Sequence, residues 1–218
     1  MTSANRQVEL LEKNKPRQER AKRTYERILV AAAELLIEVG VERISTNIMA
    51  ERAGITVPAL YRYFPNKYAV LHAMGATMMD RQNDVVLEWF EKNVDVREPA
   101  VLLQSIELLL RATYEITNSQ LAGLEIIQSL RAVGPLQEVR LTSNRLVAEQ
   151  FAVVLGEMFD WQVNEALVMQ ARLSVEMGYA VVELALEDST LSTDDTLTQG
   201  AKMIQAYWEE VLKQRASA

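Results

Sequence analysis

The sequence predicts an all-α protein, and three observations support that class. Glycine and proline are scarce, at 8 and 5 of 218 residues, which favours long helices. Apolar residues recur at helical spacing, and the sequence shows no strand-like alternation of useful length, no internal repeat and no low-complexity segment. Hydrophobic residues make up 49% of the chain and charged residues 24%, which is typical of a globular protein. We therefore expect about nine helices, in one large domain or two unequal ones.

The first helix is preceded by a polar segment. Residues 1–21 mix both charges and contain Pro16, which predicts a mobile N-terminal arm. Helical order is expected to begin near Lys22, and Gly40 is expected to end the helix as its C-cap. The helix carries one apolar stripe, formed by Ile28, Ala32, Leu35, Leu36 and Val39.

Two short helices are expected next. Ser45 is the predicted N-cap of a helix of about two turns. Gly54 is free to adopt the positive φ that a tight joint between helices requires. Thr56 is the predicted N-cap of the following helix, whose first turn tolerates Pro58. Two helices joined by a tight turn predict a helix-turn-helix, in a three-helix N-terminal domain that spans residues 22–68.

Longer amphipathic segments follow the short helices. Polar stretches, often with Gly or Pro, separate these segments from one another. They predict a larger helical domain over residues 69–218. The long helices are expected at about 66–92, 98–117, 119–132, 135–159, 164–188 and 194–215.

The charges are divided unequally along the chain. The net charge is −7, but residues 1–72 hold 12 Lys and Arg against 8 Asp and Glu, whereas residues 73–218 hold 11 against 22. A basic N-terminal part on an acidic body is typical of a protein that neutralises phosphates locally. Solvated charge runs produce similar imbalances, so the asymmetry alone decides nothing.

Composition excludes several kinds of site. The chain has no cysteine, so it has no disulfide and no thiolate ligand, and its one histidine, His72, cannot build a multi-histidine metal site. The sequence shows no phosphate-binding glycine loop and no paired metal ligands at a known spacing, so we expect no enzyme, no cofactor and no metal. The N-terminus lacks the apolar core of a signal peptide, and no apolar stretch reaches membrane-spanning length. We therefore expect a cytoplasmic protein without a membrane partner.

The most specific motif spans residues 53–67. The run Ala-Gly-Ile-Thr-Val-Pro-Ala-Leu-Tyr-Arg-Tyr-Phe-Pro-Asn-Lys resembles the DNA-binding motif of the TetR family, with its Ala-Gly turn, Leu-Tyr-x-x-Phe recognition helix and following lysine. The remainder of the chain matches that family only in length and helical character. Carried over by position, the resemblance implies phosphate contacts by Thr46, Tyr63 and Lys67. It implies positions in or beside the major groove for Asn47, Thr56, Val57, Pro58, Ala59, Tyr61 and Arg62.

The chemistry of these side chains suits the implied roles. Arg62 and Asn47 are the best equipped to read base edges through paired hydrogen bonds. The alternative for the two tyrosines is packing at a helix end, and the alternative for Lys67 is ordinary solvation. DNA contact and mere solvation both stay open for the basic residues of the arm region, Arg17, Arg20, Lys22 and Arg23.

The larger domain is expected to bind a ligand and a second subunit. Its helices carry more apolar residues than one buried face needs, although such residues also belong to ordinary cores. The candidate ligand-binding residues are Trp89, Leu110, Tyr114, Glu125, Gln128 and Phe151. The last two helices suit a dimer interface, unless their stripes bury against their own domain. The candidate interface residues are Val175, Gly178, Tyr179, Val182, Leu186, Ile204, Tyr207, Trp208 and Val211.

The favoured function is that of a sequence-specific DNA-binding transcriptional regulator. The resemblance implies a homodimeric repressor on a palindromic double-stranded operator, released by a small hydrophobic or amphiphilic ligand that shifts the population of conformers. A carboxylate-based enzyme and a helical adaptor that binds protein through its N-terminal domain are the rival interpretations. Only a DNA binder should lose affinity steeply with added salt.

Overall fold

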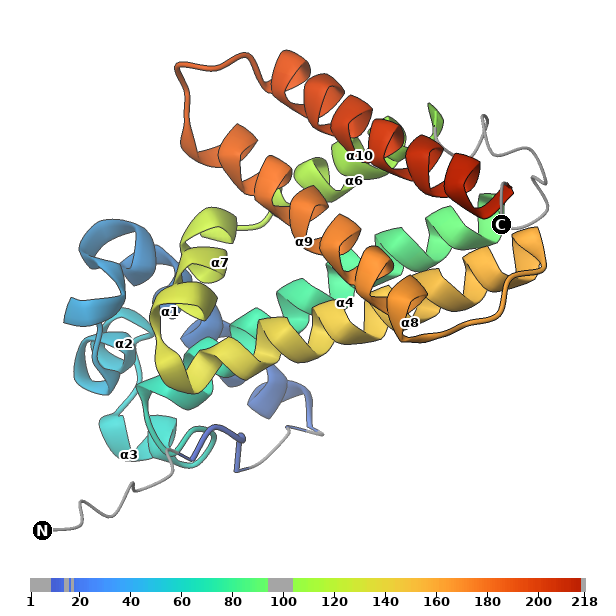
Figure 1. Ribbon diagram of the computed structural model, residues 1–218. Helices are drawn as coiled ribbons and strands as arrows, with labels where there is room; N and C mark the ends of the chain where they lie inside the picture. The colour runs from blue at the N-terminus through green and yellow to red at the C-terminus, as the bar shows by residue number, and fades with distance from the viewer. Residues whose placement is uncertain (1–8, 14–15, 17, 94–103, 217–218) are drawn as a thin grey trace, which may run out of the picture. The chain divides into compact units, whose positions relative to one another are not determined.

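The structure, a computed structural model, is built from helices (Figure 1). It describes residues 9–13, 16, 18–93 and 104–216. These described residues contain nine α-helices and no strand, which confirms the predicted class and helix number. The elements are α1 (Glu19–Arg43), α2 (Thr46–Arg52), α3 (Val57–Tyr61), α4 (Lys67–Asn93), α6 (Ile106–Asn118), α7 (Gly123–Ala132), the 3-10 turn η1 (Gly134–Leu136), α8 (Gln137–Phe159), α9 (Glu165–Glu187) and α10 (Thr193–Ala216).

Most helix ends lie within a few residues of their predicted positions. Gly40 takes the positive φ of 73° expected of a C-cap, but helical turns resume after it as far as Arg43. Helix α7 begins at Gly123, later than predicted, because Ala122 before it has a left-handed φ of 59°. Residues 98–103, the start of the helix expected at 98–117, lie outside the described residues. So do arm residues 1–8, 14, 15 and Arg17.

The chain divides into two compact units. The first unit comprises Met1–Met79 with Gln120–Arg140, and the second comprises Asp80–Ser119 with Leu141–Ala218. The first unit therefore holds α7 as well as the N-terminal helices, a long-range association that the predicted division at residues 68 and 69 does not contain.

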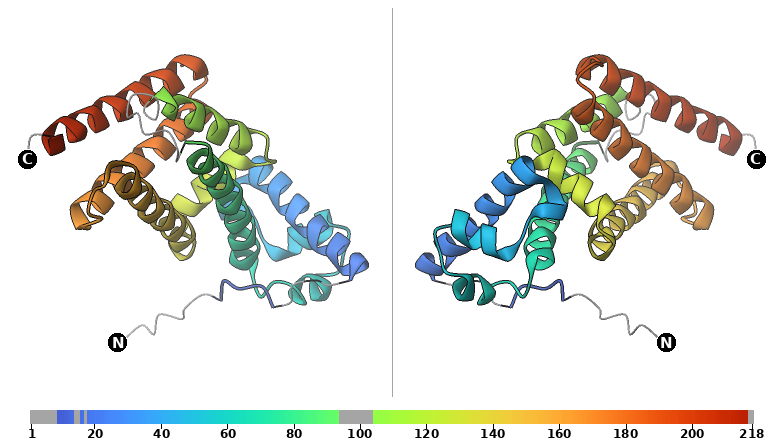
Figure 2. Two further views of the ribbon diagram at one scale, coloured as in Figure 1. Left: turned by 90° about the vertical axis from the view of Figure 1, so that its right-hand side faces the viewer. Right: turned by 90° about the vertical axis from the view of Figure 1, so that its left-hand side faces the viewer.

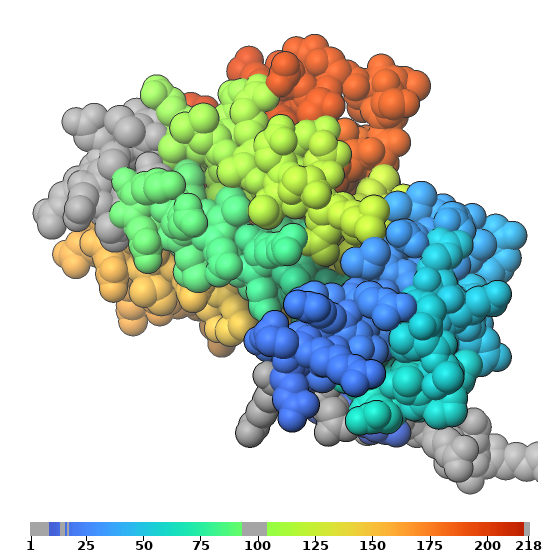
Figure 3. Space-filling model, turned by 180° about the vertical axis from the view of Figure 1, so that it is seen from behind, coloured from blue at the N-terminus to red at the C-terminus, as the bar shows by residue number. Residues whose placement is uncertain are grey.

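The core of the first unit packs α1 against the helix-turn-helix and α7. The α1 stripe predicted from the sequence is buried at Ile28, Ala32, Leu35 and Leu36. In the space-filling view the light-blue and cyan atoms of α2 and α3 lie directly against the blue atoms of α1 (Figure 3). Buried side chains from α2, α3, the following loop and α7 complete this core, namely Met49, Leu60, Phe64, Ile126, Ile127 and Leu130.

The second unit packs the C-terminal half of α4 with α6, α8, α9 and α10. Helices α6, α9 and α10 contact one another pairwise, and residues 188–192 join α9 to α10 (Figure 2). Four aromatic rings lie in contact within this core, with ring centroids 5.3 to 6.4 Å apart; they belong to Trp89, Phe90, Phe151 and Trp208. Among the described helices, none is long and apolar enough to cross a membrane.

Candidate functional site

Local hydrogen bonds shape the helix-turn-helix. The Ser45 hydroxyl accepts from the backbone N–H of Ile48 at 3.5 Å, which confirms Ser45 as the N-cap of α2. Gly54 adopts a φ of 62°, the left-handed turn predicted from the sequence. The Thr56 side chain makes no capping bond, unlike the prediction, and the first turn of α3 is instead held by the Thr56 carbonyl, which accepts from the N–H of Leu60 at 3.2 Å. The left-handed turn at Gly54 and these backbone hydrogen bonds thus join α2 to α3.

The turn is also held from α1 by an arginine that the sequence did not single out. The Arg27 guanidinium donates to the carbonyl oxygens of Ala53 and, at 3.3 Å, of Gly54. A Cβ at position 54 would lie 2.8 Å from Arg27 Nη2, so a larger residue would strain the backbone at this φ and would also displace the end of the Arg27 side chain. No local motif predicts this contact, because the partners lie 26 and 27 residues apart.

A second arginine ties α2 to α1. Arg52 donates to both carboxylate oxygens of Glu38, at 2.6 and 2.7 Å, and to Glu34 at 3.3 Å. Hydrogen bonds from Arg52 hold the pKa of the Glu38 carboxyl below its usual value. Two of the cations in the basic N-terminal part therefore serve internal contacts.

The predicted DNA-contacting residues are all at least partly accessible. Leu60 anchors α3 in the core, while the Tyr61 side chain beside it is 41% exposed. The Tyr61 hydroxyl lies 3.1 Å from the Thr46 hydroxyl, which brings a residue of α3 together with one of α2. Asn47, Thr56, Pro58, Tyr61 and Arg62 are exposed, whereas Thr46, Val57, Ala59, Tyr63 and Lys67 are half-buried.

Two of these residues also have structural partners. The Lys67 ammonium donates to the carbonyl oxygens of Val41 and Glu42, at 3.2 and 3.3 Å, at the end of α1. The Tyr63 ring packs edge-on against Tyr25, with centroids 6.2 Å apart. Tyr63 thus packs against another ring, as the alternative weighed for the tyrosines expected, whereas Lys67 is held by two carbonyls rather than merely solvated.

Part of the predicted mobile arm is attached to the first unit. The backbone N–H of Lys13 donates to the Tyr63 carbonyl at 2.7 Å, and the Asn66 amide donates to the Glu9 carbonyl at 2.8 Å. These bonds attach residues 9–13 to the segment that follows α3, although polar composition predicted a mobile arm. The partners, a backbone carbonyl and a side-chain amide, lie 50 or more residues away, so no local pattern predicts them.

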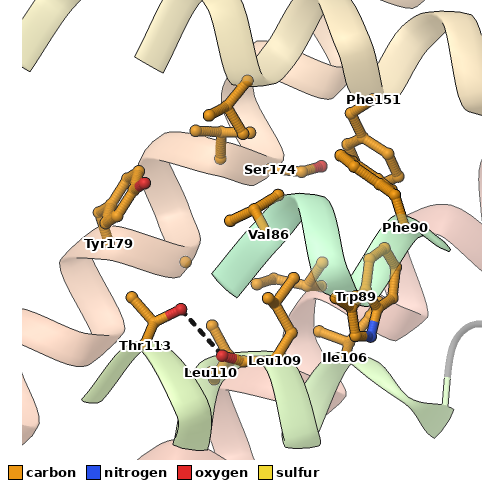
Figure 4. A pocket seen from close by; sticks show the side chains of 14 residues that line it. Val86, Trp89, Phe90, Ile106, Leu109, Leu110, Thr113, Phe151, Ser174 and Tyr179 are labelled. Atoms are coloured by element: carbon orange, nitrogen blue, oxygen red, sulfur yellow. Dashed lines mark hydrogen bonds between the residues drawn. The ribbon is translucent and has the colours of Figure 1, made fainter. Parts of the chain in front are cut away.

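The second unit contains a cavity of about 70 Å³ between its helices (Figure 4). Three of the predicted ligand-binding residues, Trp89, Leu110 and Phe151, line it. Among the described residues, no Asp, Glu, Lys, Arg or His belongs to its lining, which comprises Val86, Trp89, Phe90, Ile106, Leu109, Leu110, Thr113, Val147, Phe151, Ser174, Val175, Gly178, Tyr179 and Ile204.

The other three predicted ligand-binding residues do not line this cavity. Tyr114 is half-buried against the second core. Glu125 and Gln128 belong to α7, which is part of the first unit. Their role in ligand binding stays a prediction, but they do not share a site with Trp89, Leu110 and Phe151 in this cavity, because α7 packs with α1.

The predicted dimer residues are mostly occupied within the chain itself. Val175, Gly178, Tyr179 and Ile204 line the cavity. Val182, Trp208 and Val211 are buried in the second core, and Leu186 and Tyr207 are partly buried against it. These residues therefore pack largely within their own domain, which is the alternative weighed from the sequence, and their place in a dimer interface stays a prediction.

A different face of α9 is apolar and exposed. Met169 is 63% exposed and Leu173 52%. Helix α9 is apolar on two sides, and periodicity alone cannot say which side covers its own core. The exposed side, here called the outer stripe, follows spacings of three and four residues and consists of Ala166, Met169, Leu173, Met177, Ala180 and Leu184, of which Met177 is half-buried.

Comparisons with known proteins agree with the helix-turn-helix. Residues 28–74 match the family model described as bacterial regulatory proteins, tetR family. The chain is 46% identical over 52 residues to the class A tetracycline repressor protein of transposon 1721 from Escherichia coli, a match that covers 24% of each protein. The match thus spans about a quarter of the length of that relative.

Solved structures extend the likeness to most of the chain. A TetR-family transcriptional regulator from Streptomyces coelicolor is similar with a TM-score of 0.59 and 20% identity, over 86% of this chain and 99% of that one. A TetR family transcription regulator from Marinobacter aquaeolei has a TM-score of 0.62 and 17% identity, over 87% and 97%. At such identities the likeness is one of fold.

Proposed function

We propose that this chain, whose residues 28–74 match the model of the tetR family of bacterial regulatory proteins, acts as a sequence-specific DNA-binding repressor. The observation that carries the proposal is the accessible face of α3, where Thr56, Pro58, Tyr61 and Arg62 are exposed while Leu60 anchors the helix. A recognition helix needs this combination, because it must be held firmly while its side chains enter the major groove.

The side chains of this face divide into two roles. Arg62 and Asn47 read base edges, since guanidinium and amide groups form paired hydrogen bonds with bases. Thr46, Tyr63 and Lys67 contact phosphates. The Lys67 ammonium can do so without giving up its two carbonyl partners, because it has three donors.

Selection of bound duplexes from a random library, followed by a salt titration, tests DNA binding. We expect enrichment of one sequence and a log-log slope of affinity against salt of about −5 for six phosphate contacts. The absence of enrichment with a flat salt response contradicts the proposal and favours a protein-binding adaptor.

Arg62→Ala sharpens the same test. It should relax discrimination at particular base pairs by about 1–3 kcal/mol. Lys92→Ala is the control, since it removes an exposed cation from the second unit, where Lys92 pairs only at the surface with Glu88 at 3.4 Å. Equal effects of the two variants on base discrimination contradict the role of Arg62.

We also propose that the protein is a homodimer that recognises a palindromic operator, with the outer stripe of α9 as the interface. An exposed apolar stripe of this length is typical of an association surface, and two-fold symmetry would place two recognition helices on successive half-sites.

Leu173→Glu should convert the dimer to a monomer in analytical ultracentrifugation. Leu108→Glu, at a leucine of α6 that is 67% exposed, should leave the dimer intact. A monomeric unaltered protein, or a dimeric Leu173→Glu variant, refutes this interface.

Regulation is proposed to come from a small molecule in the cavity of the second unit. Helix α4 begins in the first unit at Lys67, and its later residues Val86, Trp89 and Phe90 line the cavity. A ligand that favours one conformer of this shared helix would shift the population that fits DNA. Operator affinity that stays unchanged at a saturating concentration of a cavity ligand contradicts this mechanism.

A further inference from the structure

The cavity wall contains three hydroxyl groups, two of which are already used. The Thr113 hydroxyl donates to the Leu109 carbonyl at 2.9 Å. The Ser174 hydroxyl donates to the Gln170 carbonyl at 3.0 Å and accepts from the indole N–H of Trp208 at 2.8 Å. Neither hydroxyl has a hydrogen left to offer a ligand.

The third hydroxyl, on Tyr179, is different. The Tyr179 side chain is 9% exposed, and its oxygen has no hydrogen-bond partner among the described residues. Burial, with a smaller effect from the nearby Glu176 carboxylate, raises the pKa of the phenol, so it stays protonated at neutral pH. A buried donor without an acceptor is costly, and a ligand that supplies the acceptor removes that cost.

The aromatic side chains lie on the other side of the cavity. Figure 4 shows Trp89, Phe90 and Phe151 together there, opposite Tyr179 and Thr113. The indole N–H of Trp89 donates to the Ser105 carbonyl at 3.1 Å, so these rings present apolar surface to the cavity. On the opposite side, Tyr179 has the one described lining hydroxyl whose hydrogen has no acceptor among the described residues. Its oxygen is fully buried, so a ligand oxygen meets it after a small side-chain movement.

The described part of the lining contains no charged side chain, which restricts the ligand further. An ionised group in this cavity would lose its hydration and find no opposite charge among the described lining residues, which is strongly unfavourable. The volume of about 70 Å³ restricts the size, since an apolar cavity of about 150 Å³ binds benzene. A single ring therefore enters only with some side-chain movement, and larger ring systems are disfavoured.

We propose, as an extension of the regulatory function proposed above, that the cavity binds a compact uncharged molecule with an aromatic or alicyclic ring and one hydrogen-bond acceptor oxygen. The ring packs against Trp89, Phe90 and Phe151, and the oxygen accepts a hydrogen bond from Tyr179. Tyr179 is thus a specificity-determining residue that selects a ketone, ester or ether over a hydrocarbon of the same shape.

The test compares two probes of nearly equal shape, acetophenone and α-methylstyrene, which differ by C=O in place of C=CH2. Their affinities for the full chain are measured by calorimetry without DNA. We expect acetophenone to bind about tenfold more tightly, the ratio that one hydrogen bond to a buried donor supplies. Tyr179→Phe should abolish that preference, and benzoate should bind less tightly than acetophenone.

Tyr114→Phe is the matched control, because it removes the same hydroxyl from a tyrosine of the second unit that does not line the cavity. It should keep the tenfold preference. Equal binding of the two probes, a preference that survives Tyr179→Phe, tighter binding of benzoate, or no binding of either probe at millimolar concentration overturns the proposal. The assay contains no DNA, so a chain that binds acetophenone yet keeps its operator affinity refutes the regulatory mechanism and leaves this ligand class standing.

Discussion

The two units differ in how they treat buried polar groups. Among the described residues, seven polar side chains are buried, and six of them belong to the second unit: Gln82, Thr113, Thr117, Ser143, Asn144 and Ser174. The first unit buries only Ser129, whose hydroxyl donates to the Glu125 carbonyl at 2.7 Å. The first core is therefore nearly all apolar, whereas the second is polar in places.

The second unit also leaves more buried polar atoms without partners among the described residues than the first, where Glu12 Oε2 is one such atom. In the second unit they include Gln82 Oε1, both amide atoms of Asn144, and the Tyr179 hydroxyl. Buried unpartnered groups lower stability and are retained most often where a site has a function. The contrast supports the proposal that the first unit holds a fixed surface while the second responds to a ligand.

The largest test of this contrast removes a ring from the first core. Phe64 is fully buried and stacks on Tyr25, with centroids 5.1 Å apart. Phe64→Ala should lower the free energy of unfolding by about 3–5 kcal/mol, measured by chemical denaturation. Leu121→Ala, at an exposed leucine of the same unit, should cost far less. Similar small losses for both would show that the first core is loosely packed.

A smaller loss is expected at the turn. Gly54→Ala places a Cβ 2.8 Å from Arg27 Nη2 at a residue with positive φ, so it should cost about 1–2 kcal/mol or more of unfolding free energy. Gly134→Ala is the control, because nothing lies within 4 Å of its added Cβ and its φ is not positive. DNA affinity should fall with Gly54→Ala alone. Unchanged thermal stability would mean that the turn tolerates the strain.

The second unit should respond in the opposite direction. Asn144 is fully buried with no partner for its amide among the described residues, so Asn144→Leu should raise the unfolding free energy by about 1 kcal/mol. Gln82→Leu should not, because it breaks the bond from Gln82 Nε2 to the Thr117 hydroxyl at 2.8 Å. A destabilised Asn144→Leu variant would contradict the view that buried, unpartnered polar groups lower the stability of this unit.

The smallest effect concerns the dependence of stability on pH. Burial lowers the pKa of His72 in the first unit, and the Glu12 carboxylate offsets this only in part. The unfolded chain then binds a proton at His72 more readily than the folded chain does. The contribution of the neutral histidine to stability is therefore complete above about pH 6.5 and is lost as the pH falls below it. His72→Gln should flatten the decline between pH 7.5 and 5, measured by urea unfolding at each pH. Parallel profiles for the two proteins would contradict it.

Local chemistry made the first unit predictable from the sequence. The Ser45 cap, the Gly54 turn and the α1 stripe each depend on a few neighbouring residues, and all three were confirmed. The motif at residues 53–67 further predicted where α3 lies and which of its side chains are accessible. The contacts of Arg27 and Arg52 were missed because their partners are remote in sequence.

The sequence by itself thus determined the helices, their order and the helix-turn-helix, because capping, turn conformation and amphipathic periodicity are properties of short segments. Only the tertiary structure decided that α7 joins the first unit, that Tyr179 and Ile204 line a cavity, and that the outer stripe of α9 is the exposed one. A helix with two apolar faces carries the same pattern whichever face is covered. The choice between faces depends on which distant helix packs there, and that choice is made by the fold as a whole.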